Sequence, residues 1–192
     1  MPPLILASSS AYRRELLSRL RLPFGCAAPG VDEAPLAAES HPDRAVRLAL
    51  AKAAAVATRH PGSTVIGSDQ IGVCKGEPLE KPGNAARARV QLQWLSAAAA
   101  TFHTAVAVLP AERGNSLQFV DTTTVYFRAL SEAEIDRYIA AEQPFDCAGG
   151  FRCEGLGISL FSRVVSEDPT GLIGLPLIAV ARALRQLGYE LP

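Results

Sequence analysis

Two arginines stand where a helix ordinarily prefers acidic residues. Residues 4–7 form a short apolar run that predicts a buried strand, and Ser10 is a good N-cap for a following helix. Arg13 and Arg14 fall in the first turn of that helix, where unpaired N–H groups carry partial positive charge and disfavour cations. A serine-rich helix start with two arginines is typical of an anion site, most simply for phosphate. The alternative is that both arginines extend into solvent near Glu15.

Carboxylates form a second group of candidates. Asp69 directly follows the apolar run 64–67, and a carboxylate there is costly to bury unless it binds something. Ligand sites also form where strands end in α/β folds. The alternative is an Asx turn at Asp69 that caps the residues after it. Asp32 and Glu33 form an acidic pair in a loop, which fits either a solvated surface or metal ligation.

Two lysines are candidates for phosphate contacts. Lys52 lies beside the face that Ala49 and Ala53 form on a predicted helix, and it either binds phosphate or extends its ammonium group to solvent. Lys81 precedes Pro82 in a loop, where a rigid backbone can aim the ammonium group. An ordinary surface turn has the same sequence.

Two later loops gather glycines and polar residues. Segment 145–155 contains two adjacent glycines, whose backbone can approach a ligand closely. Glu154 in this segment can accept the N1–H and N2–H₂ donors of guanine, and Phe151 is either a core residue or a base-stacking ring. The polar stretch 168–176 precedes a helix start and is a second candidate anion site.

The elements that must position these residues alternate between strands and helices. The apolar patterns and capping signals predict strands at 4–7, 64–67, 102–109, 117–129 and 157–161, and helices after Ser10, at 40–59, after Asn84, from Ser131 and at 176–187. The two long strands around a turn at 112–115 fit a mixed α/β sheet better than a regular doubly wound one.

Composition limits the class of protein. The 192 residues, 48% of them hydrophobic, suit one domain of two lobes over 1–192. Lys+Arg and Asp+Glu each total 19, so no overall field attracts nucleic acid or an anionic membrane. The chain has no apolar run near the ~20 residues of a spanning helix, no signal peptide and no Cys-x-x-Cys pair. We therefore expect a cytoplasmic protein with reduced thiols and neither nucleic-acid nor membrane partners.

Taken in order, these segments resemble the Maf family of nucleoside triphosphate pyrophosphatases over nearly the whole chain. The segments that carry the resemblance are 7–14 (ASSSAYRR), 31–33 (VDE), Lys52, 68–70 (SDQ), 81–82 (KP), 148–155 (AGGFRCEG) and 174–177 (GLPL). Within the family, the Ser-Asp-Gln and Phe-Arg-Cys-Glu-Gly forms are similar to the branch that acts on 7-methyl-GTP. The dTTP/UTP branch instead carries Ala-Asp-Thr, and Gln at the position of Glu154.

The resemblance implies a fold, an activity and roles for residues. It implies an elongated, curved, mixed β-sheet flanked by helices, with two lobes around a central cleft as in ITPase-like proteins, and often a homodimer. It implies hydrolysis of 7-methyl-GTP to the monophosphate and pyrophosphate, which prevents incorporation of modified nucleotides into nucleic acids. Asp69 would be the catalytic base, and substrate choice would be set by Tyr12, Gln70 and Glu154.

The charge of a nucleoside triphosphate predicts the rest of the site. Attack of water on the α-phosphorus requires neutralised phosphates, and a divalent cation such as Mg²⁺ or Mn²⁺ supplies this and lowers the pKa of bound water. Glu33 and Asp69 are the predicted metal ligands, and Asp69 can also accept the proton of the attacking water. The predicted phosphate-binding residues are Ser8, Arg13, Lys52 and Lys81.

The chain departs from the family pattern at two places that bear on charge. Glu80 stands where the family usually has Gly, and Ala97 and Ala98 replace an expected Gly-Lys pair. Both changes make the phosphate environment less positive, and they favour an alternative function as a nucleotide-binding regulator of cell division with little turnover. A nucleotidyltransferase, which passes the nucleotide to an acceptor instead of water, and a pyrophosphatase of the dTTP/UTP type also stay open.

Overall fold

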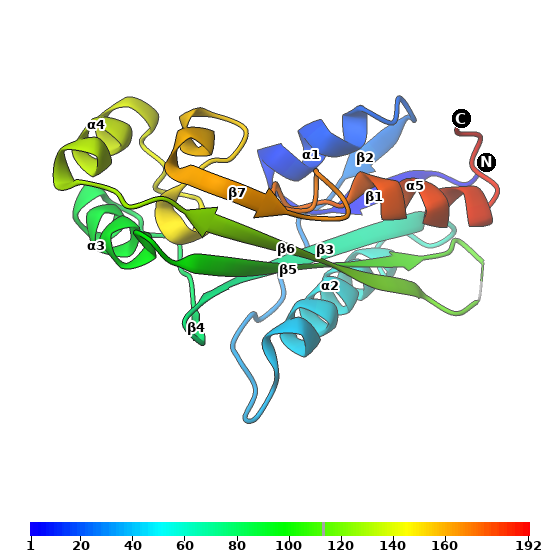
Figure 1. Ribbon diagram of the computed structural model, residues 1–192. Helices are drawn as coiled ribbons and strands as arrows, with labels where there is room; N and C mark the ends of the chain where they lie inside the picture. The colour runs from blue at the N-terminus through cyan, green and yellow to red at the C-terminus, as the bar shows by residue number, and fades with distance from the viewer. Residues whose placement is uncertain (113) are drawn as a thin grey trace. The chain divides into compact units, whose positions relative to one another are not determined.

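The computed structural model describes residues 1–112 and 114–192, and it alternates strands with helices along the chain (Figure 1). The strands are β1 (Leu4–Ala7), β2 (Phe24–Cys26), β3 (Thr64–Cys74), β4 (Glu77–Pro78), β5 (Ala99–Leu109), β6 (Leu117–Phe127) and β7 (Phe161–Val165). The α-helices are α1 (Ala11–Ser18), α2 (His41–Ala57), α3 (Ala85–Leu95), α4 (Glu132–Glu142) and α5 (Leu177–Gln186), with short 3₁₀ turns η1 (Ala148–Gly150) and η2 (Leu156–Leu160).

The strands form one mixed sheet in the order β2-β1-β3-β5-β6-β7, and β4 pairs with β3. β1 runs parallel to both β2 and β3, whereas β6 and β7 are antiparallel. The predicted mixed α/β class is therefore confirmed. The elongated, curved form, the central cleft and the single domain over 1–192 stay predictions.

Serine and asparagine caps begin four helices, as the sequence predicts. The side chains of Ser10, Ser40, Asn84 and Ser131 each accept a backbone N–H three residues later. Ser131 also forms the predicted capping box, because the Glu134 side chain accepts from the Ser131 backbone in return. These caps satisfy N–H groups that a helix start would otherwise leave without partners.

Other predicted elements differ from the structure. The run 157–161 is wrong as a strand: η2 occupies most of it and β7 begins only at Phe161. Short apolar runs do not distinguish strand from helix, and here Ile158 is 58% exposed. The short strands β2 and β4 were not predicted, and the turn at 112–115 includes Arg113, which lies outside the described residues.

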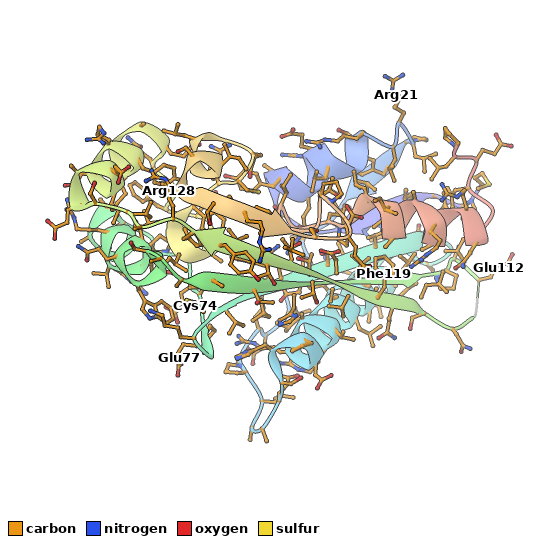
Figure 2. The ribbon with its side chains drawn as sticks, in the orientation of Figure 1. Arg21, Cys74, Glu77, Glu112, Phe119 and Arg128 are labelled. Carbon is orange, nitrogen blue, oxygen red and sulfur yellow. The ribbon has the colours of Figure 1, made fainter. Side chains whose placement is uncertain are left out.

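Arg21 and Ala97 are non-glycine residues whose backbone has a positive φ angle. Arg21, after α1, has φ 55°, and its exposed side chain points away from the ribbon (Figure 2). Ala97 also has φ 55°, in the left-handed region that favours glycine. That conformation fits the Gly that the resemblance to the Maf family implies at this position.

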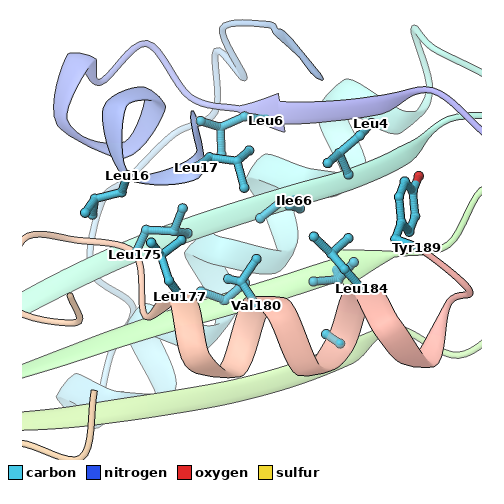
Figure 3. Close-up of a cluster of buried hydrophobic side chains, with 13 residues drawn as sticks. Leu4, Leu6, Leu16, Leu17, Ile66, Leu175, Leu177, Val180, Leu184 and Tyr189 are labelled. Carbon is cyan, nitrogen blue, oxygen red and sulfur yellow. The ribbon is translucent and has the colours of Figure 1, made fainter. Parts of the chain in front are cut away.

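Contacts divide the chain into two compact units. The first unit comprises residues 1–70, 103–121 and 168–192. Its core joins one face of β1 and β3 to α1 and α5, as Figure 3 shows for Leu6, Ile66 and Leu184, all of them fully buried. Helix α2 lies on the opposite face of these strands (Figure 1). The first unit thus has a sheet covered by helices on both faces.

The second unit comprises residues 71–102 and 122–167. Helices α3 and α4 pack together in it (Figure 1). Phe151 is 5% exposed and meets Phe102, Phe127 and Phe161 edge to face, with ring centroids 5.3–5.5 Å apart. Of the two interpretations of Phe151, the structure supports a core residue.

Candidate functional site

Gly67 on β3 lets helix α2 approach the strand closely. A Cβ atom at this position would collide with the backbone oxygen of Ala49 and lie 2.7 Å from the backbone nitrogen of Ala53. Both alanines are fully buried, so the helix meets the glycine with small side chains. The close approach brings Lys52 of the same helix beside Asp69, which is two residues beyond Gly67 and so on the same face of the strand.

Lys52 bridges the two carboxylates predicted to bind metal. Its Nζ lies 2.6 Å from Oδ1 of Asp69 and 2.6 Å from Oε1 of Glu33. The side chains of Lys52 and Asp69 are each 7% exposed, whereas that of Glu33 is 57% exposed. The sequence-based alternative of a lysine extending into solvent is therefore wrong, and so is that of a purely solvated Glu33.

Asp69 does not lie where the sequence pattern placed it. Strand β3 continues from Thr64 to Cys74, so Asp69 lies inside the strand and not directly after it. The Asx-turn alternative is wrong for the same reason. The strand continues through polar residues because its two faces meet different partners, and the Lys52 ammonium compensates the buried carboxylate.

Ser68 and Gln70 point to the other face of β3, toward the segment before α5. Ser68 is fully buried and its Oγ donates to the backbone oxygen of Gly174 at 2.9 Å. The Gln70 amide Nε2 donates to the backbone oxygens of Gly171 and Leu172, both at 3.0 Å. The Ser-Asp-Gln motif is therefore divided between two faces, with Asp69 on the α2 side.

Arg13 is tied to the same segment from helix α1. Its Nε donates to the backbone oxygen of Gly174 at 3.0 Å, and its backbone N–H donates to the Ser10 cap at 3.3 Å. Burial lowers the pKa of the Arg13 guanidinium, while Asp69 and Glu33 act in the opposite direction. Arg14 is exposed, and among the described residues no hydrogen bond or ion pair holds its side chain. Of the two predicted arginines, Arg13 is thus the one that the fold anchors.

Ser8 supports the start of α1. Its side chain is buried, and its Oγ accepts the backbone N–H of Ser10 at 3.1 Å. Tyr12 in the first turn is half-buried. The structure therefore brings seven predicted site residues into one unit, namely Ser8, Tyr12, Arg13, Glu33, Lys52, Asp69 and Gln70.

The second candidate anion site, before α5, is wrong. Asp168 is 4% exposed, and its Oδ2 accepts the backbone N–H of Ile178 at 2.7 Å. The hydroxyl of Thr170 accepts the backbone N–H of Leu177 at 2.8 Å and donates to Asp168. The chain's own carboxylate and hydroxyl thus occupy the helix start that an anion would need.

Lys81 and Glu154 belong to the second unit. Lys81 is exposed. Glu154 lies 3.6 Å from Nε of Arg152, whose Nη1 lies 3.0 Å from Glu142. Glu80, one of the departures from the family pattern, pairs with Arg87 at 2.9 Å, so a cation of the chain offsets its added negative charge.

Two buried hydroxyls near the site were not predicted. Ser68 and Thr104 are both fully buried, and each donates to a backbone oxygen of the segment 171–174. Ser68 offered a signal in the sequence, because it is a polar residue that directly follows an apolar strand pattern. Thr104 offered none, since threonine is common in strands.

The protein supplies only part of a donor set for a hard divalent cation. Among the described residues, no three side chains of His, Cys, Asp or Glu converge as a metal cluster. Two carboxylates, Glu33 and Asp69, converge on Lys52 Nζ. Mg²⁺ is commonly held by one or two carboxylates together with substrate phosphates and waters, so the pair fits such a cation with substrate bound.

The fold is shared with solved structures of HAM1 proteins. A HAM1 protein from Coxiella burnetii aligns with a TM-score of 0.53 at 13% identity, covering 97% of this chain and all of that one. The Ham1 protein of Staphylococcus aureus aligns with a TM-score of 0.52 at 13% identity, over 95% of this chain and 99% of that one. These likenesses define the fold class, and they agree with the predicted ITPase-like architecture.

The chain belongs to the family of Maf-like proteins, whose model matches residues 3–187. It is 56% identical over 192 residues to a 7-methyl-GTP pyrophosphatase of Xanthomonas oryzae pv. oryzae, covering both chains completely. It is 53% identical over 189 residues to a 7-methyl-GTP pyrophosphatase of Bordetella pertussis, covering 98% of this chain and 94% of that one. The family predicted from the sequence is confirmed.

Among residues 1–112 and 114–192, no helix has the length and apolar character needed to cross a bilayer.

Proposed function

We propose that this protein hydrolyses the α–β phosphoanhydride bond of a nucleoside triphosphate, with 7-methyl-GTP as its preferred substrate. The observation that carries the proposal is the group of Lys52, Asp69 and Glu33 near Arg13, which combines cations for phosphate with a carboxylate for water. The full-length relatives named 7-methyl-GTP pyrophosphatase support the choice of substrate. The products are the nucleoside monophosphate and pyrophosphate.

Asp69 acts as the general base in this proposal. A carboxylate within hydrogen-bond reach of a water can accept its proton as the water attacks the α-phosphorus, and such a base contributes ~10²–10⁴ in rate. Lys52, which already contacts Asp69, and Arg13 face the negative charge of the phosphates. Ser8 and Lys81 complete the phosphate contacts that we propose, and the cations stabilise the departing pyrophosphate.

A divalent cation, Mg²⁺ or Mn²⁺, belongs to the proposal. Glu33 and Asp69 would hold it, together with oxygens of the substrate. When bound, such a cation neutralises phosphate charge and lowers the pKa of a coordinated water. Since Lys52 Nζ contacts the same two carboxylates, the lysine supplies the positive charge beside them when no cation is bound.

The nucleobase of the substrate is selected by Tyr12, Gln70 and Glu154. Methylation at N7 makes guanine cationic, so an aromatic ring and a carboxylate together favour it over unmethylated guanine. Tyr12 supplies the ring, and Glu154 accepts the N1–H and N2–H₂ donors. The biological use is clearance of a modified nucleotide before a polymerase incorporates it, which we place in the cytoplasm, with the protein acting as a homodimer.

One assay tests the proposal directly. Purified protein is incubated with 7-methyl-GTP, GTP, dTTP and UTP, with Mg²⁺ or Mn²⁺ or with a chelator, and pyrophosphate release is measured. We expect the highest kcat/KM for 7-methyl-GTP and loss of turnover with the chelator. Preference for dTTP or UTP would assign the chain to the other branch, and binding without turnover would support the regulator alternative. Pyrophosphate release that requires a second acceptor would indicate a nucleotidyltransferase.

A further inference from the structure

The segment between β7 and α5 is held against the site by side chains of β3 and β5. Its Gly171 backbone oxygen accepts from Nε2 of Gln70 at 3.0 Å and from Oγ1 of Thr104 at 2.9 Å. Nε2 of Gln70 also donates to Oγ1 of Thr104 at 2.9 Å and to the backbone oxygen of Leu172. These backbone acceptors fix which end of the Gln70 amide is the donor, because a carbonyl cannot donate to a carbonyl.

The same segment fixes Arg13. The Gly174 backbone oxygen accepts from Oγ of Ser68 at 2.9 Å and from Nε of Arg13 at 3.0 Å. Gly174 has φ 125°, a conformation that L side chains rarely adopt, so glycine is favoured at this position. The Gly174 N–H donates to the Gly171 oxygen at 3.0 Å, so the two ends of the segment are joined.

Arg13 keeps donors that this contact does not use. A guanidinium carries five N–H donors in one plane, and a bond at Nε fixes the direction of the others. Among the described residues, only Nε of the Arg13 guanidinium makes a hydrogen bond or ion pair. The Gly174 carbonyl therefore determines where the Nη groups point.

We infer that Ser68 and Thr104 are positioning residues that hold the segment 171–174 and, through the Gly174 carbonyl, orient the guanidinium of Arg13 for the phosphates of the substrate. The inference rests on the proposed function for the identity of the ligand. It also gives two residues of the Ser-Asp-Gln motif different roles: Asp69 serves the chemistry on one face of β3, while its neighbour Ser68 sets the geometry on the other.

The first test needs no substrate. Exchange of the Arg13 Nε–H with water is followed by ¹⁵N NMR in the wild type, Ser68→Ala and Thr104→Val. We expect slow exchange in the wild type and exchange at least about fivefold faster in both variants, since a hydrogen bond contributes ~1 kcal/mol net. The exposed Arg21 provides a fast-exchanging reference within each spectrum. Unchanged exchange of the Arg13 Nε–H in both folded variants would overturn the inference.

The second test measures the consequence for phosphate. Binding of inorganic pyrophosphate is measured by calorimetry for Ser68→Ala and Thr104→Val, each alone and combined with Arg13→Ala. We expect about fivefold weaker binding in each single variant and less than about a twofold further change once Arg13 is absent. Equal effects with and without Arg13 would overturn the positioning role.

A matched variant controls for general destabilisation. Thr123→Val also removes a fully buried threonine hydroxyl, which contacts Ser166 Oγ at 2.8 Å in the second unit. It should leave the Arg13 Nε–H exchange and pyrophosphate binding unchanged. If Ser68→Ala does not fold, the nearly isosteric Thr104→Val decides the question alone. A wild type that hydrolyses no nucleotide but shows the expected exchange pattern would refute the proposed function and leave the hydrogen-bond network standing.

Discussion

The Lys52 ammonium on α2 contacts the Asp69 carboxylate on β3 at 2.6 Å, and both side chains are almost completely buried. Burial of two charges is favourable only with good geometry and further hydrogen bonds, and here Glu33 provides a second acceptor for Lys52. A buried pair of this kind is weak evidence for stability. It is better explained by a functional need for opposite charges at one place.

The first prediction concerns Asp69. Asp69→Asn keeps the size of the side chain and an oxygen for Lys52, but it loses the negative charge and the capacity to accept a proton. We expect turnover of 7-methyl-GTP to fall by ~10² or more, the scale of a lost general base, with the fold retained. Steady-state kinetics and circular dichroism measure the two effects.

The control for Asp69→Asn is Asp136→Asn, which removes a half-exposed carboxylate paired with Arg89 on α3. It should leave turnover unchanged. Near-normal turnover in Asp69→Asn itself would show that Asp69 only neutralises Lys52.

The second prediction concerns the close approach of α2 to β3. Gly67→Ala places a methyl group against the Ala49 backbone, which cannot move without moving the helix. We expect a loss of ~1–3 kcal/mol in the free energy of unfolding, the usual range for overpacking. Turnover should fall as well, because the displaced helix carries Lys52 away from Asp69. Urea denaturation and kinetics measure both.

Gly25→Ala on β2 is the matched control, since a Cβ there has no atom within 4 Å. It should change neither stability nor turnover appreciably. If Gly67→Ala behaves in the same way, the glycine is not what positions Lys52.

The third prediction concerns recognition of the nucleobase. Glu154→Gln removes the negative charge that we propose opposes the cationic ring of 7-methylguanine. The ratio of kcat/KM for 7-methyl-GTP over GTP should therefore shrink toward one. Glu142→Gln is the comparison, because Glu142 also pairs with Arg152 but is not assigned to the base. A ratio that Glu154→Gln leaves intact would remove Glu154 from the selectivity argument.

The fourth prediction concerns the pH dependence of stability through Glu134. Hydrogen bonds from the Ser131 backbone and hydroxyl, and then from Arg128, lower the pKa of Glu134 from 4.5 to about 2. A carboxyl whose pKa is lowered on folding stabilises the fold above its unfolded pKa, and this contribution is lost as pH falls toward the folded value. The stability difference between wild type and Glu134→Gln should therefore be larger at neutral pH than near the folded pKa. Urea midpoints under both conditions measure it, and a constant difference would contradict the capping role.

Local signals in the sequence determined the starts of the helices and much of the sheet. Strand β1 spans the predicted residues 4–7, and the caps at Ser10, Ser40 and Ser131 begin the predicted helices. These features depend on residues within three or four positions of one another, so a single segment contains the information. The family pattern added the candidates for the site residues, because its motifs recur in order along the chain.

Only the tertiary structure decided how those residues meet. Lys52 reaches Asp69 across 17 positions of sequence, and Arg13 reaches the Gly174 carbonyl across 161. The sequence placed Asp69 after a strand and proposed an anion site before α5, whereas the fold continues β3 through Asp69 and fills that helix start with Asp168. Such contacts depend on which face of a strand meets which partner, and no short segment encodes that, because the partner lies far away in the chain.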